Sequence, residues 1–444
     1  MTPRATPATG WRVVAVAAAA LCMPSFAAAP ASATVSPHSI PRATLRAAAG
    51  NAAADIPCPK PAVKPPPGRP PRPAPPRDDP VLRAVGGDTL ATSGLIMPSG
   101  SPAPPAVTAT SWLVADLDSG EVLGGCGPHV YGTPASVQKL LLAATVLPML
   151  DPTATATITR ADVTIEPGSS AVGLVEHGRY TVATLWLGLI LNSGNDAANT
   201  LARLGGGRGG VAATVAAMNA EARRLGAFQT HAVTPSGLDG PGQFTSAYDL
   251  AEIARVCFDR ADFRRYALTR RAQIPAQPAL KKPGFEIQNE NRLIFDYPGA
   301  LGGKTGFTEL ARHSYVGAAQ RGGRRLVVTL LGAEARPLRG WQQGAALLDW
   351  GFSLPRDASV GKLVDPDRAD PAGTGSATNA AVPPATAPPQ VQPTTARSAP
   401  RALSFGAVAA IAIVLAVTPL LVLSAQRRRR RRRRRLRRRV PTYR

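Results

Sequence analysis

The stretch TPASVQKLLLAATVLP, residues 133–148, predicts a buried helix that begins near a serine and carries a lysine three residues later. Ser136 and Lys139 then lie on one face of that helix. A serine at a helix N-terminus has free N–H groups and the positive end of the helix dipole close by, which favours negative charge on an attacked carbonyl. Lys139 is the candidate base if burial and a second cation lower its pKa towards neutrality. Taken alone, this pair is more often a helix cap followed by a surface lysine.

Two further short elements carry candidate chemistry. The turn LNSGNDAAN, residues 191–199, presents the Ser193 hydroxyl beside the Asn195 amide, suited to passing a proton and holding a substrate amide. The run LGGKTGFT, residues 301–308, offers Lys304 and Thr305 to a terminal carboxylate, and its glycines let a peptide approach a sheet edge. Lys304 is also the candidate second cation. Each element alone is as well explained by an ordinary helix–helix turn or strand entry.

The surrounding pattern predicts an α+β fold. Residues 111–117 and 121–125 alternate as two strands joined by a turn, and residues 313–320 and 324–333 form a hairpin around Arg321-Gly322-Gly323. Several apolar helices lie between these strand pairs, one of them capped by Thr245 or Ser246, and another helix closes the domain. This order predicts an antiparallel sheet flanked by helices on both faces, with a large helical subdomain inserted. We expect that domain to span residues 81–355.

Both ends of the chain predict export and membrane anchoring. Residues 1–33 have the positive start, short apolar run and small-residue cleavage site of a signal peptide. Residues 405–425 are apolar enough to span a bilayer, and the arginine-rich tail 426–444 follows. Positive flanks stay in the cytoplasm, so we expect a single-pass membrane protein with its body outside and its C-terminus inside. A lipoprotein anchored at Cys22 is a minor alternative.

Between these ends and the body lie two proline-rich segments. Residues 34–80 predict a disordered, extended stalk, and residues 356–404 predict a disordered Pro/Ala/Thr tether. After signal removal, Cys58, Cys126 and Cys257 remain in an oxidising compartment, so we expect one disulfide and one free thiol. Cys58 with Cys126 is the pairing that we favour.

Several other function classes find little support. The formal net charge of +23 comes largely from the tail, where residues 427–439 hold twelve arginines, so it predicts lipid headgroup contact and no nucleic-acid partner. The glycine run 205–210 follows a predicted helix where a dinucleotide fingerprint needs a strand. Five scattered histidines give a metal site or a histidine triad no starting point, and we predict neither metal nor cofactor.

Taken in order, the three elements resemble the motifs of the penicillin-recognising serine acyltransferases. Ser136-x-x-Lys139, Ser193-Gly194-Asn195 and Lys304-Thr305-Gly306 match them, and SGNDAAN, residues 234–251 and the run PGALGGKTGFT resemble the D-alanyl-D-alanine carboxypeptidases, the low-molecular-mass penicillin-binding proteins. The resemblance covers about residues 111–354 and implies a β-lactamase/transpeptidase-like fold.

The resemblance also implies roles. Ser136 attacks the carbonyl between the last two D-alanines of a peptidoglycan stem peptide, and Lys139 is its base. Ser193 and Asn195 move the proton and position the substrate, and Lys304 and Thr305 bind the carboxylate. Backbone N–H groups of Ser136 and Phe307, next to Gly306, form the oxyanion hole, and β-lactams acylate Ser136 as inhibitors.

Two departures and two rivals stay open at this stage. We expect no second β-rich domain after residue 354, and Arg312 stands where relatives often have glycine, without an evident partner. A β-lactamase of the same fold is one rival, although the glutamate that class A enzymes place after the second motif has no clear counterpart. A membrane-tethered module that binds wall peptide or β-lactam without turnover is the other.

Overall fold

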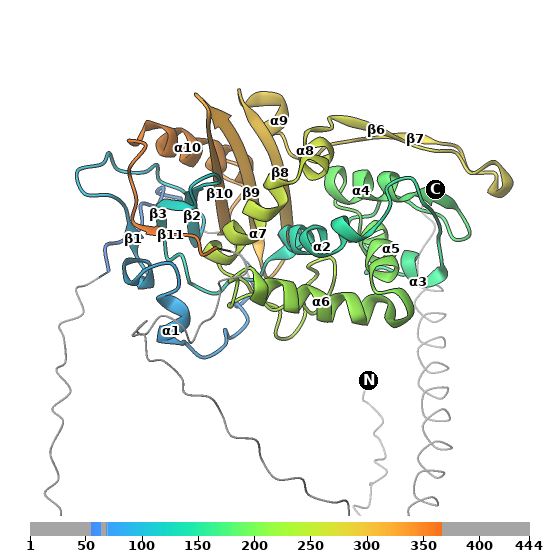
Figure 1. Ribbon diagram of the computed structural model, residues 1–444, viewed down its shortest axis with the longest axis horizontal. Coiled ribbons are helices and arrows are strands. Elements are labelled where there is room, and N and C mark those ends of the chain that lie inside the picture. The colour runs from blue at the N-terminus through green and yellow to red at the C-terminus, as the bar shows by residue number, and fades with distance from the viewer. Residues whose placement is uncertain (1–54, 64–67, 69, 366–444) are drawn as a thin grey trace, which may run out of the picture. The chain divides into compact units, whose positions relative to one another are not determined.

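A computed structural model describes residues 55–63, 68 and 70–365 of the chain. Its centre is a seven-stranded antiparallel sheet in the order β1-β3-β2-β10-β9-β8, with β11 paired to β3 (Figure 1). The strands are β1 (Leu95–Ile96), β2 (Ser111–Asp116), β3 (Glu121–Cys126), β8 (Ala300–Thr308), β9 (Arg312–Arg321), β10 (Arg324–Ala333) and β11 (Gly361–Lys362). Chain-distant segments therefore meet in the middle of the sheet, where β2 pairs with β10.

The two predicted hairpins are present. Strands β9 and β10 pair from Arg321 opposite Arg324, and the turn residues Gly322 and Gly323 have φ angles of 56° and 75°. Residues with a side chain rarely adopt such angles, which explains a pair of glycines here. Strands β2 and β3 pair in the same antiparallel way. The expected α+β architecture is confirmed.

Alternation along the strands divides the core between the two faces of the sheet. Trp112 and Val114 pack with α10 (Gly340–Ser353) on one face, whereas Leu113 and Ala115 face the helices on the other. That second face is covered by α7 (Ala247–Asp259), with α2 (Lys139–Val146) beyond it (Figure 1).

The helical subdomain lies between β3 and β8 in the chain. It contains α3 (Arg160–Val163), α4 (Val182–Leu191), α5 (Asn195–Gly205), α6 (Gly210–Arg224), α8 (Ala261–Leu268) and α9 (Leu293–Asp296). Two small hairpins accompany them, β4 (Thr155–Thr157) with β5 (Arg179–Thr181), and β6 (Arg271–Ile274) with β7 (Phe285–Gln288). Helix α7 is capped by Ser246, whose hydroxyl accepts from the Asp249 N–H at 3.1 Å, as the sequence predicts. The hairpin β6–β7 was not predicted.

The described part of the predicted stalk around Cys58 packs against the sheet. The Ile56 carbonyl accepts from the Leu95 N–H at 2.7 Å, and Cys58 forms a disulfide with Cys126 on β3. The favoured cysteine pairing is thus confirmed, and Cys257 is the buried free thiol. The prediction of a free stalk through residue 80 is wrong for this part, because the disulfide and the strand-like hydrogen bonds fix residues near 58 to β1 and β3. The segment then runs into the short helix α1 (Pro80–Arg83).

The ordered body also extends further towards the C-terminus than predicted. Beyond residue 355, β11 pairs with β3, and the Val364 N–H donates to Glu252 on α7 at 2.6 Å. The predicted tether therefore cannot begin at residue 356. None of the helices in the described ranges has the length and hydrophobicity of a bilayer-spanning segment. The predicted signal peptide, transmembrane segment 405–425 and arginine tail lie outside those ranges, as does most of the tether.

Candidate active site

The candidate nucleophile lies where a 3-10 turn (Ala135–Gln138) leads into α2. Ala135 has a φ of 50°, which is unfavourable for a residue with a side chain. The Pro134 carbonyl just before it accepts from the Ser314 hydroxyl of β9 at 2.6 Å. Contacts with the sheet thus hold a strained turn that presents the partly exposed Ser136 to solvent.

Lys139, one turn further on, is completely buried. Its Nζ donates to Ser136 Oγ at 2.9 Å, to Asn195 Oδ1 at 2.8 Å and to the Ser236 carbonyl at 2.8 Å. Burial, and next the charge of Lys304, place the pKa of Lys139 well below its ordinary value, against weaker opposing effects of Glu290 and Asp196. An amine that loses its proton this readily and touches a serine hydroxyl is suited to act as a general base.

The second element forms a tight turn between α4 and α5. Ser193 has a φ of 56°, and its buried Oγ has no hydrogen-bond partner among the described residues. A side chain on Gly194 would collide with Val172, so the glycine is required there. Asp196 holds the facing loop through the N–H groups of residues 172–174. The structure thus brings Ser193 to the site, but it is Asn195, and not Ser193, that contacts Lys139.

The third element is the edge strand β8, which runs beside the nucleophile. A Cβ on Gly306 would lie 2.9 Å from the Ser136 nitrogen, so only glycine allows this approach. Lys304 is buried, donates to the Thr305 carbonyl at 2.8 Å, and has its pKa lowered to about 8, chiefly by burial. Lys304 is thus near enough for its charge to act on Lys139, whose amine contacts the Ser136 hydroxyl.

These elements surround an open cleft of about 1120 Å³. All the predicted site residues except the two lysines line it, and the lysines lie buried behind its wall. The predicted residues that line it are Ser136, Ser193, Asn195, Thr305, Gly306 and Phe307. In the described part of the chain, no group of three His, Cys, Asp or Glu side chains is arranged to hold a metal ion.

The cleft also contains charged residues that the sequence did not single out. Arg339, just before α10, adds a cation to the cleft lining, and Glu290 adds a carboxylate. Asp239 accepts from the Thr308 hydroxyl at 2.7 Å and so links the loop after residue 234 to the end of β8. Asp239 falls within residues 234–251, which carry part of the resemblance, whereas Arg339 and Glu290 belong to no stretch that the sequence analysis singled out.

Arg312 has partners that the sequence did not reveal. Its guanidinium contacts the Glu334 carboxylate at 3.1 Å and Glu309 at 3.2 Å, and it lies 5.3 Å from the centre of the Phe307 ring. His313 packs against the same ring at 4.7 Å. Arg312 has a φ of 58°, the conformation that glycine adopts easily, which explains why glycine also suits this position. Arg312 therefore helps hold the Phe307 ring at the cleft mouth.

Comparison with known proteins gives one consistent answer. The family model described as D-alanyl-D-alanine carboxypeptidase, peptidase family S11, matches residues 99–335. The carboxypeptidase DacB2 of Mycobacterium tuberculosis is 46% identical over 277 residues, covering 60% of this chain and 90% of that protein. DacD of Escherichia coli is 33% identical over 282 residues, covering 60% of this chain and 70% of that protein.

Solved structures agree with the sequence matches. A D-alanyl-D-alanine carboxypeptidase from Mycobacterium tuberculosis matches with a TM-score of 0.57 at 44% identity, over 60% of this chain and all of that one. The Streptomyces K15 DD-transpeptidase matches with a TM-score of 0.54 at 27% identity, over 57% of this chain and all of that one. The matched part is the body that carries the cleft.

Proposed function

Since this chain belongs to the D-alanyl-D-alanine carboxypeptidase family of serine peptidases, we propose that it removes the terminal D-alanine from peptidoglycan stem pentapeptides through an acyl-enzyme on Ser136. The observation that carries the proposal is the triple contact of the buried Lys139 amine, one of whose partners is the Ser136 hydroxyl. A pure binding module has no need of a buried amine of lowered pKa beside a hydroxyl.

The acylation step follows from these positions. Lys139 takes the proton of Ser136 as Oγ attacks the carbonyl between the two D-alanines. Backbone N–H groups of Ser136 and Phe307 stabilise the oxyanion. The amide C–N bond then breaks, and the proton passes to the leaving nitrogen by way of Ser193, whose unpartnered hydroxyl is available to a substrate. Free D-alanine leaves, and Ser136 carries the shortened peptide as an ester.

Deacylation and substrate binding use the same groups. Water attacks the ester, Lys139 accepts its proton, and the peptide acid leaves with Ser136 restored. Lys304 and Thr305 bind the substrate's terminal carboxylate, and Arg339 on the same cleft adds a second positive charge. Asn195 and the Gly306–Phe307 backbone position the acyl part of the peptide along the edge of β8. β-Lactams would acylate Ser136 in the same manner.

The test uses the purified full-length protein and a synthetic stem pentapeptide. We expect release of one D-alanine per peptide by the wild type and none by Ser136→Ala. Labelled penicillin should modify Ser136 alone. If the wild type binds the peptide and releases no D-alanine, the binding-module alternative replaces the proposal.

β-Lactamase activity is the second candidate, because Glu166 gives the cleft wall a carboxylate. Glu221, the first glutamate after the second motif, pairs with Arg224 on α6 and does not line the cleft. The adduct formed with labelled penicillin separates the two activities. A long-lived adduct fits the carboxypeptidase, whereas repeated rapid hydrolysis of penicillin would favour the lactamase.

We also propose that the body is exported and anchored by residues 405–425, with the arginine tail in the cytoplasm. Support comes from the apolar length of that segment and the positive charge directly after it. A chain truncated after residue 365 should leave the membrane fraction of the expressing bacterium, and externally added protease should release the body of the full-length chain. Membrane retention of the truncated chain would contradict the proposal.

A further inference from the structure

Glu290 belongs to none of the three motifs, yet it lines the cleft beside them. Its backbone N–H donates to the Leu191 carbonyl at 3.0 Å, at the end of α4 and two residues before Ser193. The segment that holds Glu290 is therefore attached directly to the turn of the second motif.

The neighbours of Glu290 fix its backbone on both sides. Asn289 is buried and donates to the Ala267 and Thr269 carbonyls, and buried Asn291 accepts from the Tyr315 hydroxyl of β9 at 3.1 Å. Glu290 itself is exposed to the cleft. The backbone that carries this carboxylate is therefore held in a fixed position at the cleft.

The proposed mechanism requires opposite protonation states of the two buried amines. Lys139 must be neutral to accept a proton, whereas Lys304 must be charged to bind a carboxylate. Both are buried, and each amine's charge disfavours the charge of the other. Among the described residues, neither forms an ion pair with a carboxylate. A carboxylate at longer range would therefore favour the protonated form of the Lys304 amine.

Several of the other charged groups around the amines are engaged elsewhere. Asp196 acts on Lys139, but its carboxylate is occupied by backbone N–H groups. Further groups facing the cleft from the surrounding elements are Glu166, Asp239 (bonded to Thr308), Arg292 (paired with Asp296), Glu309 (paired with Arg312), His313, Tyr315 and Arg339. Glu290 is the carboxylate whose charge raises the pKa of Lys139 and of Lys304 alike.

We propose that Glu290 is a positioning residue that acts through the two lysines: its charge keeps the Lys304 amine protonated, and so able to bind the substrate carboxylate, in the pH range where Lys139 accepts a proton. This inference rests on the proposed function. Glu290 makes no contact with the reacting atoms in this account. Its contribution is the pH range over which the cleft works.

The experiment is a pH profile of kcat/KM for D-alanine release by the full-length protein at low ionic strength. In Glu290→Gln we expect both limbs to move to lower pH by about half a unit, the size expected for one partly solvated charge. Activity on the alkaline limb then falls about threefold. Raising salt to about 1 M should bring the two profiles together, because it screens the interaction.

Two variants control the result. Glu290→Asp keeps the charge and should restore the wild-type profile. Glu286→Gln removes a carboxylate from the neighbouring strand β7, where it pairs with Arg271 outside the cleft, and should leave the profile unchanged. A merely structural defect would lower the plateau without moving both limbs in one direction.

Three results would overturn the inference. They are unchanged limbs in Glu290→Gln, an equal shift in Glu286→Gln, and a rise of kcat/KM at every pH, which would mean that Glu290 only repels the substrate. The acylation rate with labelled penicillin, measured over the same pH range, gives a second readout that does not require D-alanine release. If D-alanine release is absent while the acylation profile shifts as expected, the proposed function fails and the inference stands.

Discussion

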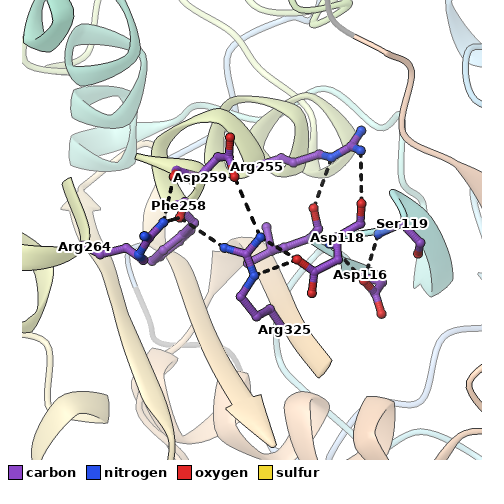
Figure 2. Close-up of polar contacts among 9 residues, drawn as sticks. Asp116, Asp118, Ser119, Arg255, Phe258, Asp259, Arg264 and Arg325 are labelled. Carbon is purple, nitrogen blue, oxygen red and sulfur yellow. Dashed lines mark hydrogen bonds and ion pairs between the residues drawn. The ribbon is translucent and has the colours of Figure 1, made fainter. Parts of the chain in front are cut away.

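The cleft and the turn between β2 and β3 differ in how their charged side chains are paired. At the turn, Arg325 contacts Asp118 at 2.7 Å and lies 3.8 Å from Asp259, while Arg255 donates to the Leu117 and Asp118 carbonyls (Figure 2). Beside them, Arg324 contacts Asp116 at 2.8 Å, and Asp116 also accepts from the N–H groups of residues 118 and 119. We call these residues the turn cluster. Each of its arginines has a carboxylate or carbonyl partner.

The cleft instead buries two amines with no carboxylate in direct contact among the described residues. Lys139 touches a hydroxyl, an amide oxygen and a carbonyl, and Lys304 touches one carbonyl. Burial without a counter-charge is unfavourable, and it lowers both pKa values. Paired charges thus hold strands together at the turn. In the cleft, burial of an amine without a counter-charge lowers its pKa and so makes it reactive. The difference predicts that substitutions in the two regions affect stability and activity separately.

The largest effect is expected at Lys139. Replacing it by methionine removes the base, and acylation of Ser136 by labelled penicillin should slow by about 10²–10⁴-fold. Stopped-flow or gel-based acylation kinetics measure this directly. Lys139→Arg is the control, since it keeps a positive charge that cannot act as a base and should be equally slow. Near-normal acylation in either variant would show that another group takes the serine proton.

The turn cluster gives the opposite result. Asp116→Asn leaves Arg324, 6% exposed, without its counter-charge, and should lower the free energy of unfolding by about 3 kcal/mol. Urea unfolding measures the loss. Labelled penicillin should still react at the wild-type rate per folded molecule.

A matched double variant completes this test. Replacing both partners, Asp116→Asn with Arg324→Met, should recover most of the lost stability, because no unpaired charge remains and the amide oxygen still accepts from the N–H groups of the turn. A slower reaction with penicillin in Asp116→Asn would break the separation between the two regions.

Lys304 should make the free energy of unfolding depend on pH. Its pKa is about 8 in the folded protein, below the ordinary 10.5, so burial of its charge destabilises the fold at pH 7. Between pH 8 and 10.5 the unfolded chain keeps the proton that the folded protein has lost, and wild-type stability rises relative to a variant without the amine. Lys304→Met should therefore be more stable than the wild type at pH 7 by about 2 kcal/mol, while losing carboxylate binding.

Urea unfolding of Lys304→Met and wild type at pH 7 and pH 9.5 tests that sign. The difference should shrink at the higher pH. The expected cost of the lysine would be refuted if the variant were less stable at pH 7, because the hydrogen bond to the Thr305 carbonyl would then outweigh the burial of the charge.

The sequence could predict the three elements of the cleft because each is local, and their joint role in one site followed from the resemblance to a known family. The spacing of Ser136 and Lys139 places both residues on one helix face. The glycines beside Ser193 and Lys304 indicate positions where the backbone packs too closely for a side chain. The hairpin at Gly322 and Gly323 could be predicted for the same reason. Such features depend on neighbours in the chain.

The remaining features depend on partners far apart in the chain. Arg312 and Glu334 meet because β8, β9 and β10 pair in one particular register, which no local pattern specifies. Arg339 and Glu290 reach the cleft for a similar reason. The packing of the proline-rich segment near Cys58 depends on a disulfide to a strand 68 residues away. Proline-rich composition alone predicts only an extended chain.

The smallest effect is expected at the exposed side of the turn cluster. Arg325 and Asp118 have side chains that are 22% and 46% exposed, and pairs in such solvated positions contribute little. Arg325→Gln should lower the free energy of unfolding by about 0.5–1 kcal/mol, and Asp118→Asn by a similar amount. The double variant should lose about as much stability as either single one, because either substitution alone already breaks the pair.

High salt should reduce the effect of each substitution, whereas the loss in Asp116→Asn should persist because that pair is buried. A salt-insensitive loss of several kcal/mol in Arg325→Gln would mean that the turn cluster acts as one buried network, and the contrast would then lie between the whole cluster and the cleft.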